Sequence, residues 1–197
     1  MSLQKRDELV EHIIATQPSL RGFMRDLPTD ISIGSWDLIS YSFQRGFEAI
    51  WDLARADHSG LLLSPLLSLW RQSVELALKS AILEIAGNIE NKPGHDLQKL
   101  FEQLCKISAD GGLCNDDDLT RDVAAMIDLA QSFDPFADRF RYPSGKKGEP
   151  YEGLDVDLDE LFQSHWIIVT WCEGTVVELR EKFGIGSPQP FLRCESE

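Results

Sequence analysis

The stretch SPLLSLWRQSVELALKSAILEIAG, from Ser64 to Gly87, decides the fold. Its apolar residues recur at the three- and four-residue spacing of one helical face: Leu67, Trp70, Val74, Leu78, Ala81 and Ile85. A second stripe, nearly opposite, repeats every seven residues: Leu62, Leu69, Leu76 and Leu83. A helix that is apolar on two sides needs cover on both. We therefore expect the central helix of a bundle, its second side lying under another helix or a second subunit.

The ends of this helix are also marked in the sequence. Ser64 is expected to be its N-cap, because Pro65 directly after it suits the first turn of a helix. Gly87 is expected to end the helix, since glycine is the residue that most readily adopts the left-handed conformation of a C-terminal cap.

Three charged residues, Arg71, Glu75 and Lys79, follow one another at four-residue steps along the same helix. On a solvated face such a ladder contributes little to stability. Arg71, however, lies within the apolar arc, Glu75 lies on its border, and Lys79 is expected to reach solvent. Because a buried charge without a partner is very costly, we expect Arg71 to be half-buried in a structural ion pair.

Composition places the chain among ordinary globular proteins. It has 197 residues, 43% of them apolar, which suits one domain with an N-terminal extension. The net charge of −14 repels phosphate backbones at long range. This argues against a broad, sequence-independent DNA-binding surface, although a local basic patch would still be compatible with nucleic acid.

The sequence carries no signal for a metal, a cofactor or a membrane. The cysteines lack zinc-ligand spacing and are expected to be reduced thiols: Cys105, Cys114, Cys172 and Cys194. The N-terminus is polar, and no apolar run approaches the length of a membrane span. We therefore expect a soluble, cytoplasmic protein without metal or cofactor.

Further helices are predicted on both sides of the central one, and no segment alternates strongly as a strand does. Residues 35–56 should form an antiparallel neighbour. Its stripe is expected to be Trp36, Ile39, Phe43, Ile50 and Leu53, widened by Phe47, Trp51 and Ala54. The fold class is all-α. Residues 1–34 are predicted to be an N-terminal helical extension, with a short helix over 3–15, and residues 185–197 a loose tail.

Two shorter helices are expected after the central one. The first begins at GHDLQKLFEQL, Gly94–Leu104, with Asp96 or His95 as its cap. The second begins at Asp116, Asp117 and Asp118. Three adjacent carboxylates suggest either a metal site or a helix start at which they offset the positive end of the helix dipole, and we favour the helix start.

A long connection follows over residues 133–153, with three prolines and three glycines. It gathers four basic residues, with Phe140 and Tyr142 among them: Arg139, Arg141, Lys146 and Lys147. Arginine beside an aromatic ring can bind a phosphate while the ring stacks on a base. The alternative is a solvated loop anchored by its aromatic residues.

The last helix is predicted to begin near Asp157 or Asp159 and to end at Gly184. Its apolar stripe contains His165. A histidine in such a position is usually a hydrogen-bonded core residue, and a catalytic or ligand-binding role is the alternative.

Three segments in order resemble the HEPN superfamily: LWRQSVELALKSAIL (Leu69–Leu83), GHDLQKLFEQL (Gly94–Leu104) and FRYPSGKKGE (Phe140–Glu149). They are similar to a bacterial branch with an arginine–glutamate–lysine helix, a Gly-His-Asp-Leu helix start and a Phe-Arg-Tyr-Pro loop. The resemblance covers residues 35–184. It implies an up-and-down bundle of four main helices with an extra short helix, and a homodimer, with which the second leucine stripe agrees.

Many HEPN domains are ribonucleases of toxin–antitoxin and phage-defence systems. The resemblance implies that an arginine, followed four to six residues later by a histidine near the start of the final helix, would cleave RNA without metal. His165 lies on the last helix here, but residues 155–161, DVDLDEL, contain no arginine. The usual pair is therefore missing, and a rebuilt site would have to use Arg141 with His165 or His95.

Three functions remain. The first is a non-catalytic module that binds a nucleotide, an RNA end or a protein partner near Arg71, His95 and the Arg141–Lys147 loop. The second is a purely structural role in assembly with a partner. The third is a divergent ribonuclease in which Arg141 stabilises the transition state and His165 transfers the proton. The residues expected in a binding site or polar network are Arg71, Glu75, Lys79, His95, Asp96, Arg141, Tyr142, Lys146 and Lys147.

Overall fold

The computed structural model describes residues 12, 15, 35–90, 93–145 and 148–184. Contacts divide the chain into two compact units, Met1–Ser35 and Trp36–Glu197. The second unit contains α4 (Trp36–Ala56), α5 (Leu63–Ala86), α6 (Leu97–Asp110), α7 (Asp118–Phe133) and α8 (Leu158–Phe183). Several predicted features fall outside the described residues: most of the helix over residues 3–15, the tail over 185–197, and both Lys146 and Lys147.

The prediction of an all-α helical bundle is confirmed. Within the described residues, strand-like pairing is limited to one bridge between Ser144 and Pro150. None of the described helices is both long and apolar enough to cross a bilayer.

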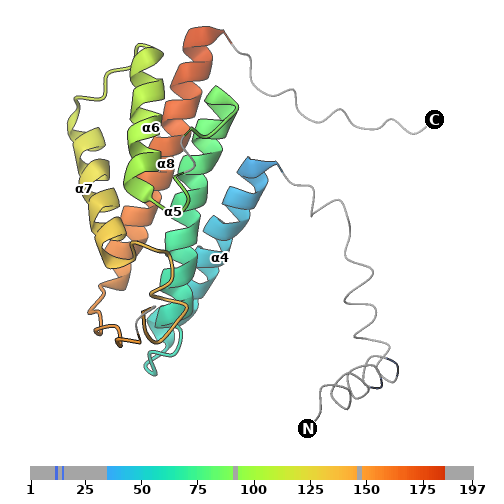
Figure 1. Ribbon diagram of the computed structural model, residues 1–197, viewed down its shortest axis with the longest axis vertical. Coiled ribbons are helices and arrows are strands. Elements are labelled where there is room, and N and C mark those ends of the chain that lie inside the picture. Colours follow the sequence, from blue (N-terminus) through green and yellow to red (C-terminus); the bar gives the residue numbers. More distant parts are fainter. Residues whose placement is uncertain (1–11, 13–14, 16–34, 91–92, 146–147, 185–197) are drawn as a thin grey trace. The chain divides into compact units, whose positions relative to one another are not determined.

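The helices alternate in direction along the chain except at one step (Figure 1). Helix α4 descends to the turn at residues 57–62, and α5 ascends beside it. The chain then returns, so that His95 lies at the level of Arg71 in the middle of α5, and α6 ascends again. Helix α7 descends and α8 ascends, which brings the end of α8 at Lys182 to Gly112, just after α6. Four helices thus alternate, and α6 is the additional, shortest one.

Helix α5 is the centre of this unit, as the two apolar stripes predict. It packs against α4, α6 and α8. Every residue from Trp70 to Ile82 is buried except Gln72 and Lys79, which are half-buried. On the second side Leu76 is buried, and Leu69 packs against Gly46 of α4. The second leucine stripe is therefore at least partly covered within the same chain.

The start of α5 differs from the prediction, whereas its end agrees. The helix begins at Leu63 with Leu62 in the N-cap position, so Ser64 lies inside the first turn and is not the cap. The turn before it, in which the Ser59 backbone N–H donates to Asp57, leads the chain into helix two residues early. Pro65 fits because backbone N–H groups of a first turn lack intrahelical partners anyway. Gly87 ends the helix at φ 72°.

Helix α4 turns only part of the predicted face inward: Phe47 and Ala54 are buried, and Ile50 and Trp51 pack against the core. Its buried residues are Ser40, Phe47 and Ala54, whereas Trp36, Ile39 and Leu53 are exposed. Two of the three buried residues are small, which allows the α4 backbone to approach α5 closely. The packing distance between helices, rather than the largest side chains, therefore decides which face turns inward.

Candidate polar network and loop site

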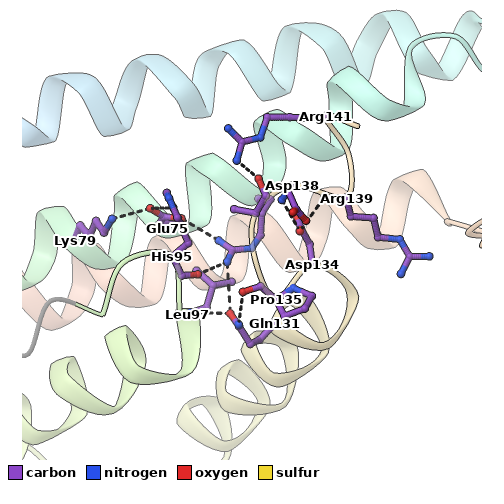
Figure 2. A network of polar contacts seen from close by, with 12 residues as sticks. Glu75, Lys79, His95, Leu97, Gln131, Asp134, Pro135, Asp138, Arg139 and Arg141 are labelled. Carbon is purple, nitrogen blue, oxygen red and sulfur yellow. Dashed lines mark hydrogen bonds and ion pairs between the residues drawn. The ribbon is translucent and has the colours of Figure 1, made fainter. Parts of the chain in front are cut away.

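The centre of the polar network is Glu75, which is only 1% exposed. Its carboxylate accepts hydrogen bonds from Arg71 Nη1 at 3.2 Å and from Lys79 Nζ at 2.7 Å. His95 Nδ1 lies 3.0 Å from the same carboxylate. Figure 2 shows the Lys79 and His95 side chains beside that of Glu75. The predicted arginine–glutamate–lysine ladder is therefore largely buried, with three polar side chains directed at one carboxylate.

Arg71 connects α5 to two other parts of the chain. Only 2% of Arg71 is exposed, so it is more deeply buried than the half-buried pair we expected. Its Nη2 donates to the His95 carbonyl oxygen and, at 3.4 Å, to Gln131 Oε1. Burial lowers the pKa of Arg71, while the nearby carboxylates of Glu75 and Asp134 act in the opposite direction. Its Nε is buried without a hydrogen-bond partner.

Gln131, near the end of α7, completes the network. Its Oε1 accepts from the Leu97 backbone N–H at 2.8 Å, and its Nε2 donates to the Pro135 carbonyl oxygen at 3.1 Å. One amide thus holds the start of α6 against the chain that leaves α7 (Figure 2). The network ties three helices together and uses most of its hydrogen-bonding groups to do so.

Asp134 shapes the loop that follows α7. It is 2% exposed, and its Oδ1 accepts from the backbone N–H groups of Asp138 at 2.8 Å and Arg139 at 3.1 Å. Ala137 between them adopts a left-handed conformation with φ 56°. The Tyr151 hydroxyl donates to Asp138 Oδ1 at 2.9 Å, and this hydrogen bond raises the pKa of Tyr151. Backbone and side-chain bonds therefore hold this turn in one conformation.

Arg141 and Tyr142 lie on the surface of this loop. Both side chains are exposed, and Arg141 Nη2 donates to the Ala137 carbonyl oxygen in the same turn. Arg139 points elsewhere: its Nη2 donates to the Glu152 carbonyl oxygen at 2.7 Å, and its guanidinium lies 5.5 Å from the centroid of the Tyr151 ring. Of the two described basic residues in the predicted cluster, Arg141 is the exposed one and Arg139 is half-buried.

His165 occupies different surroundings from Arg141. It is 3% exposed and lies between α4, α5 and α8, with its Nε2 2.8 Å from Ser73 Oγ and its ring centroid 4.3 Å from that of Phe47. Burial lowers the pKa of His165 to about 4. The imidazole is therefore neutral at pH 7, as expected for a hydrogen-bonded core histidine.

The remaining predicted residues act at helix starts. Asp96 caps α6 by accepting from the Lys99 backbone N–H at 3.1 Å, as predicted. Asp117 caps α7, while Asp116 and Asp118 both pair with Arg121. These three carboxylates start a helix, as we favoured. Asp157 caps α8.

The sequence did not point to Gln131, Asp134 or Ser73. Gln131 and Ser73 sit on helices beside ordinary apolar residues, and their partners lie far along the chain. Asp134 carried a usable signal, since an aspartate between a helix end and Pro135 commonly accepts hydrogen bonds from the turn that follows.

Comparisons of this chain with protein-family models, with curated proteins and with solved structures find no match.

Proposed function

We propose that this chain is a non-catalytic HEPN-like module that binds a ligand with a terminal phosphate, such as a nucleotide or an RNA end. The observation that supports it is that Arg141 and Tyr142 are neighbouring exposed residues on a turn held by Asp134 and Asp138. A guanidinium binds phosphate through paired hydrogen bonds, and an exposed ring stacks on a base. A role in phage defence or a toxin–antitoxin system rests on the HEPN resemblance.

The charge of the protein favours a short ligand over a long one. With a net charge of −14, each additional phosphate of an RNA chain meets a repulsive field. One arginine and one aromatic ring match one phosphate and one base. A nucleotide or the 5′ end of an RNA therefore suits this loop better than an extended strand.

The ribonuclease alternative has less support from the geometry. A general acid or base must reach the proton that it transfers. His165 is buried, neutral at pH 7 and hydrogen-bonded to Ser73, and no arginine precedes it in residues 155–161. We therefore favour the binding module over the divergent ribonuclease.

The binding proposal is tested by calorimetric titration of the chain with adenosine monophosphate and with adenosine. We expect the phosphate form to bind and the nucleoside to bind at least about tenfold more weakly, which corresponds to about 1.4 kcal/mol. Arg141→Ala should abolish the difference between the two ligands. Arg45→Ala, an exposed arginine on α4, is the matched control and should retain it.

Two results would contradict the proposal. Equal binding of the two ligands by the unchanged protein would show that the phosphate does not contribute to binding. If the unchanged protein cleaved a short RNA and His165→Gln did not, the ribonuclease alternative would be supported instead.

A homodimer is a second proposal, and the exposed side of α4 favours it. Leu38, Tyr41 and Leu53 are 47%, 56% and 59% exposed. Exposed apolar side chains gathered along one helix are typical of interaction surfaces. The second leucine stripe of α5 no longer supports a dimer, because α4 at least partly covers it within the chain.

Sedimentation of the chain tests the dimer. We expect the mass of two chains for the unchanged protein and of one chain for Leu53→Lys, since a charge within an apolar interface opposes association. Leu119→Lys on α7, where the leucine is 51% exposed, is the matched control and should remain a dimer. A single-chain mass for the unchanged protein would contradict this proposal.

A further inference from the structure

A cavity of about 400 Å³ lies between α5, α7, the start of α8 and the connection that precedes α8. This volume lies within the range of small-molecule sites. Most of its wall is apolar and aromatic, with contributions from Leu67, Trp70, Met126, Phe133, Phe140 and Val156. The wall is therefore suited to the apolar body of a small ligand. Phe140 precedes Arg141 in the loop, but neither Arg141 nor Tyr142 lines the cavity.

Trp70, which lines this cavity, has a buried hydrogen-bond donor without an acceptor. It is 6% exposed, and its indole Nε1 is buried with no hydrogen-bond partner. A buried donor that lacks an acceptor destabilises the folded protein, so such groups usually find one. Because Trp70 lines the cavity, an oxygen of a bound ligand is an acceptor that could meet this donor.

Carboxylates give the same cavity a negative lining on one side. Asp155, Asp157 and Glu160 all contribute to it and are exposed. Asp157 uses its side chain to cap α8, and the neighbouring Asp159, which does not line the cavity, pairs with Arg55. Asp155 and Glu160 therefore supply the charge that an incoming ligand would meet, and that charge favours a cation.

We propose that this cavity binds a small organic cation: an amine with an aromatic or alkyl body and an oxygen that can accept a hydrogen bond. The apolar wall takes the body, Asp155 and Glu160 attract the ammonium group, and Trp70 donates its N–H to the oxygen. The site uses neither Arg141 nor Tyr142, the residues proposed to bind phosphate and base.

The experiment uses three probes of similar size and shape, titrated calorimetrically into the full chain. They are 2-(4-methoxyphenyl)ethylamine, its anionic counterpart 3-(4-methoxyphenyl)propionate, and 2-(4-ethylphenyl)ethylamine, which lacks the ether oxygen. We expect the first to bind, the second to give no heat of binding, and the third to bind several-fold more weakly. Binding of the propionate as tight as that of the methoxy amine would overturn the proposal. Equal binding by the two amines would overturn the role of Trp70.

Two variants assign binding to this cavity. Glu160→Gln removes one carboxylate from the lining and should weaken the methoxy amine several-fold. Glu181→Gln, an exposed glutamate near the far end of α8, is the matched control and should leave affinity unchanged. Ser164→Phe fills the cavity from α8 and should abolish binding while its circular dichroism stays that of the unchanged protein. Unaltered affinity in Glu160→Gln would overturn the site even if Ser164→Phe failed to fold.

Discussion

Glu75 is the acceptor on which the side chains of Arg71, Lys79 and His95 converge, and it is almost completely withdrawn from water. A buried carboxylate of this kind is stabilised by its partners, and they in turn depend on it. Replacing it by a neutral amide of the same shape leaves the Arg71 charge buried with only carbonyl acceptors.

Glu75→Gln is therefore expected to lower the free energy of unfolding by about 3 kcal/mol. Urea unfolding followed by circular dichroism measures this. Glu178→Gln, an exposed glutamate on α8, is the control and should change stability by less than about 0.5 kcal/mol. A Glu75→Gln protein as stable as the control would show that the network does not hold the helices.

His165 makes stability depend on pH in a defined window. Its pKa is about 4 in the folded protein against an ordinary value of 6.5, because burial disfavours the imidazolium. Below pH 6.5 the unfolded chain therefore binds a proton that the folded chain does not. The contribution of the neutral histidine is complete above pH 6.5 and is lost as the pH falls toward 4.

The loss across that window should approach about 3 kcal/mol relative to a variant that does not titrate. The measurement is the difference in unfolding free energy between the unchanged protein and His165→Gln, from pH 7 down to pH 4. Taking the difference removes the pH-dependent contributions of the other titratable groups, because both proteins share them. A difference that stays constant with pH would mean that His165 titrates as it does in water.

Single residues also mark the limit of what the sequence could predict about the site. Arg71 was assigned a partner correctly, because a charge within an apolar arc needs one. Gln131 was missed, since its partners are the Leu97 N–H and the Pro135 carbonyl oxygen, and only the folded chain brings these together. The apolar face of a helix can be found from spacing alone, whereas a hydrogen bond between distant segments cannot.

At the scale of the helices, residues that contact only nearby backbone groups were predicted best. Asp96, Gly87 and Gly184 end or start their helices as expected, because a cap contacts backbone groups within four residues. The inward face of α4 was predicted wrongly in part. Ser40 and Gly46 lie against neighbours because they are small, and no apolar spacing reports that.

The start of α8 provides a prediction at this scale. The Asp157 carboxylate accepts from the backbone N–H groups of Asp159 at 2.9 Å and Glu160 at 3.0 Å. Asp157→Ala should lower the free energy of unfolding by about 1 kcal/mol, the usual cost of losing an N-cap. Thermal melting checks this, with Asp155→Ala as the control that leaves the cap in place. Equal melting temperatures for the two variants would contradict the capping role.

At the scale of the whole molecule, the sequence predicted a helical bundle around a doubly apolar α5, and the structure agrees. The return of the chain between α5 and α6 accounts for the position of the polar network. It brings His95 and Leu97 back to the middle of α5, where Arg71 and the end of α7 meet them. The motif residues thus divide into a group that joins helices, centred on the buried Arg71 and Glu75 with the exposed His95 at its edge, and an exposed group on the Arg141 loop.

This division is the central claim, and thermal melting with and without adenosine monophosphate tests it most directly. Arg71→Met should melt about 10 °C lower than the unchanged protein, as expected for breaking a buried pair, and should still be stabilised by the nucleotide. Arg141→Ala should melt like the unchanged protein and show no stabilisation by the nucleotide. An Arg71→Met protein with an unchanged melting temperature, or an Arg141→Ala protein that the nucleotide still stabilises, would contradict the account.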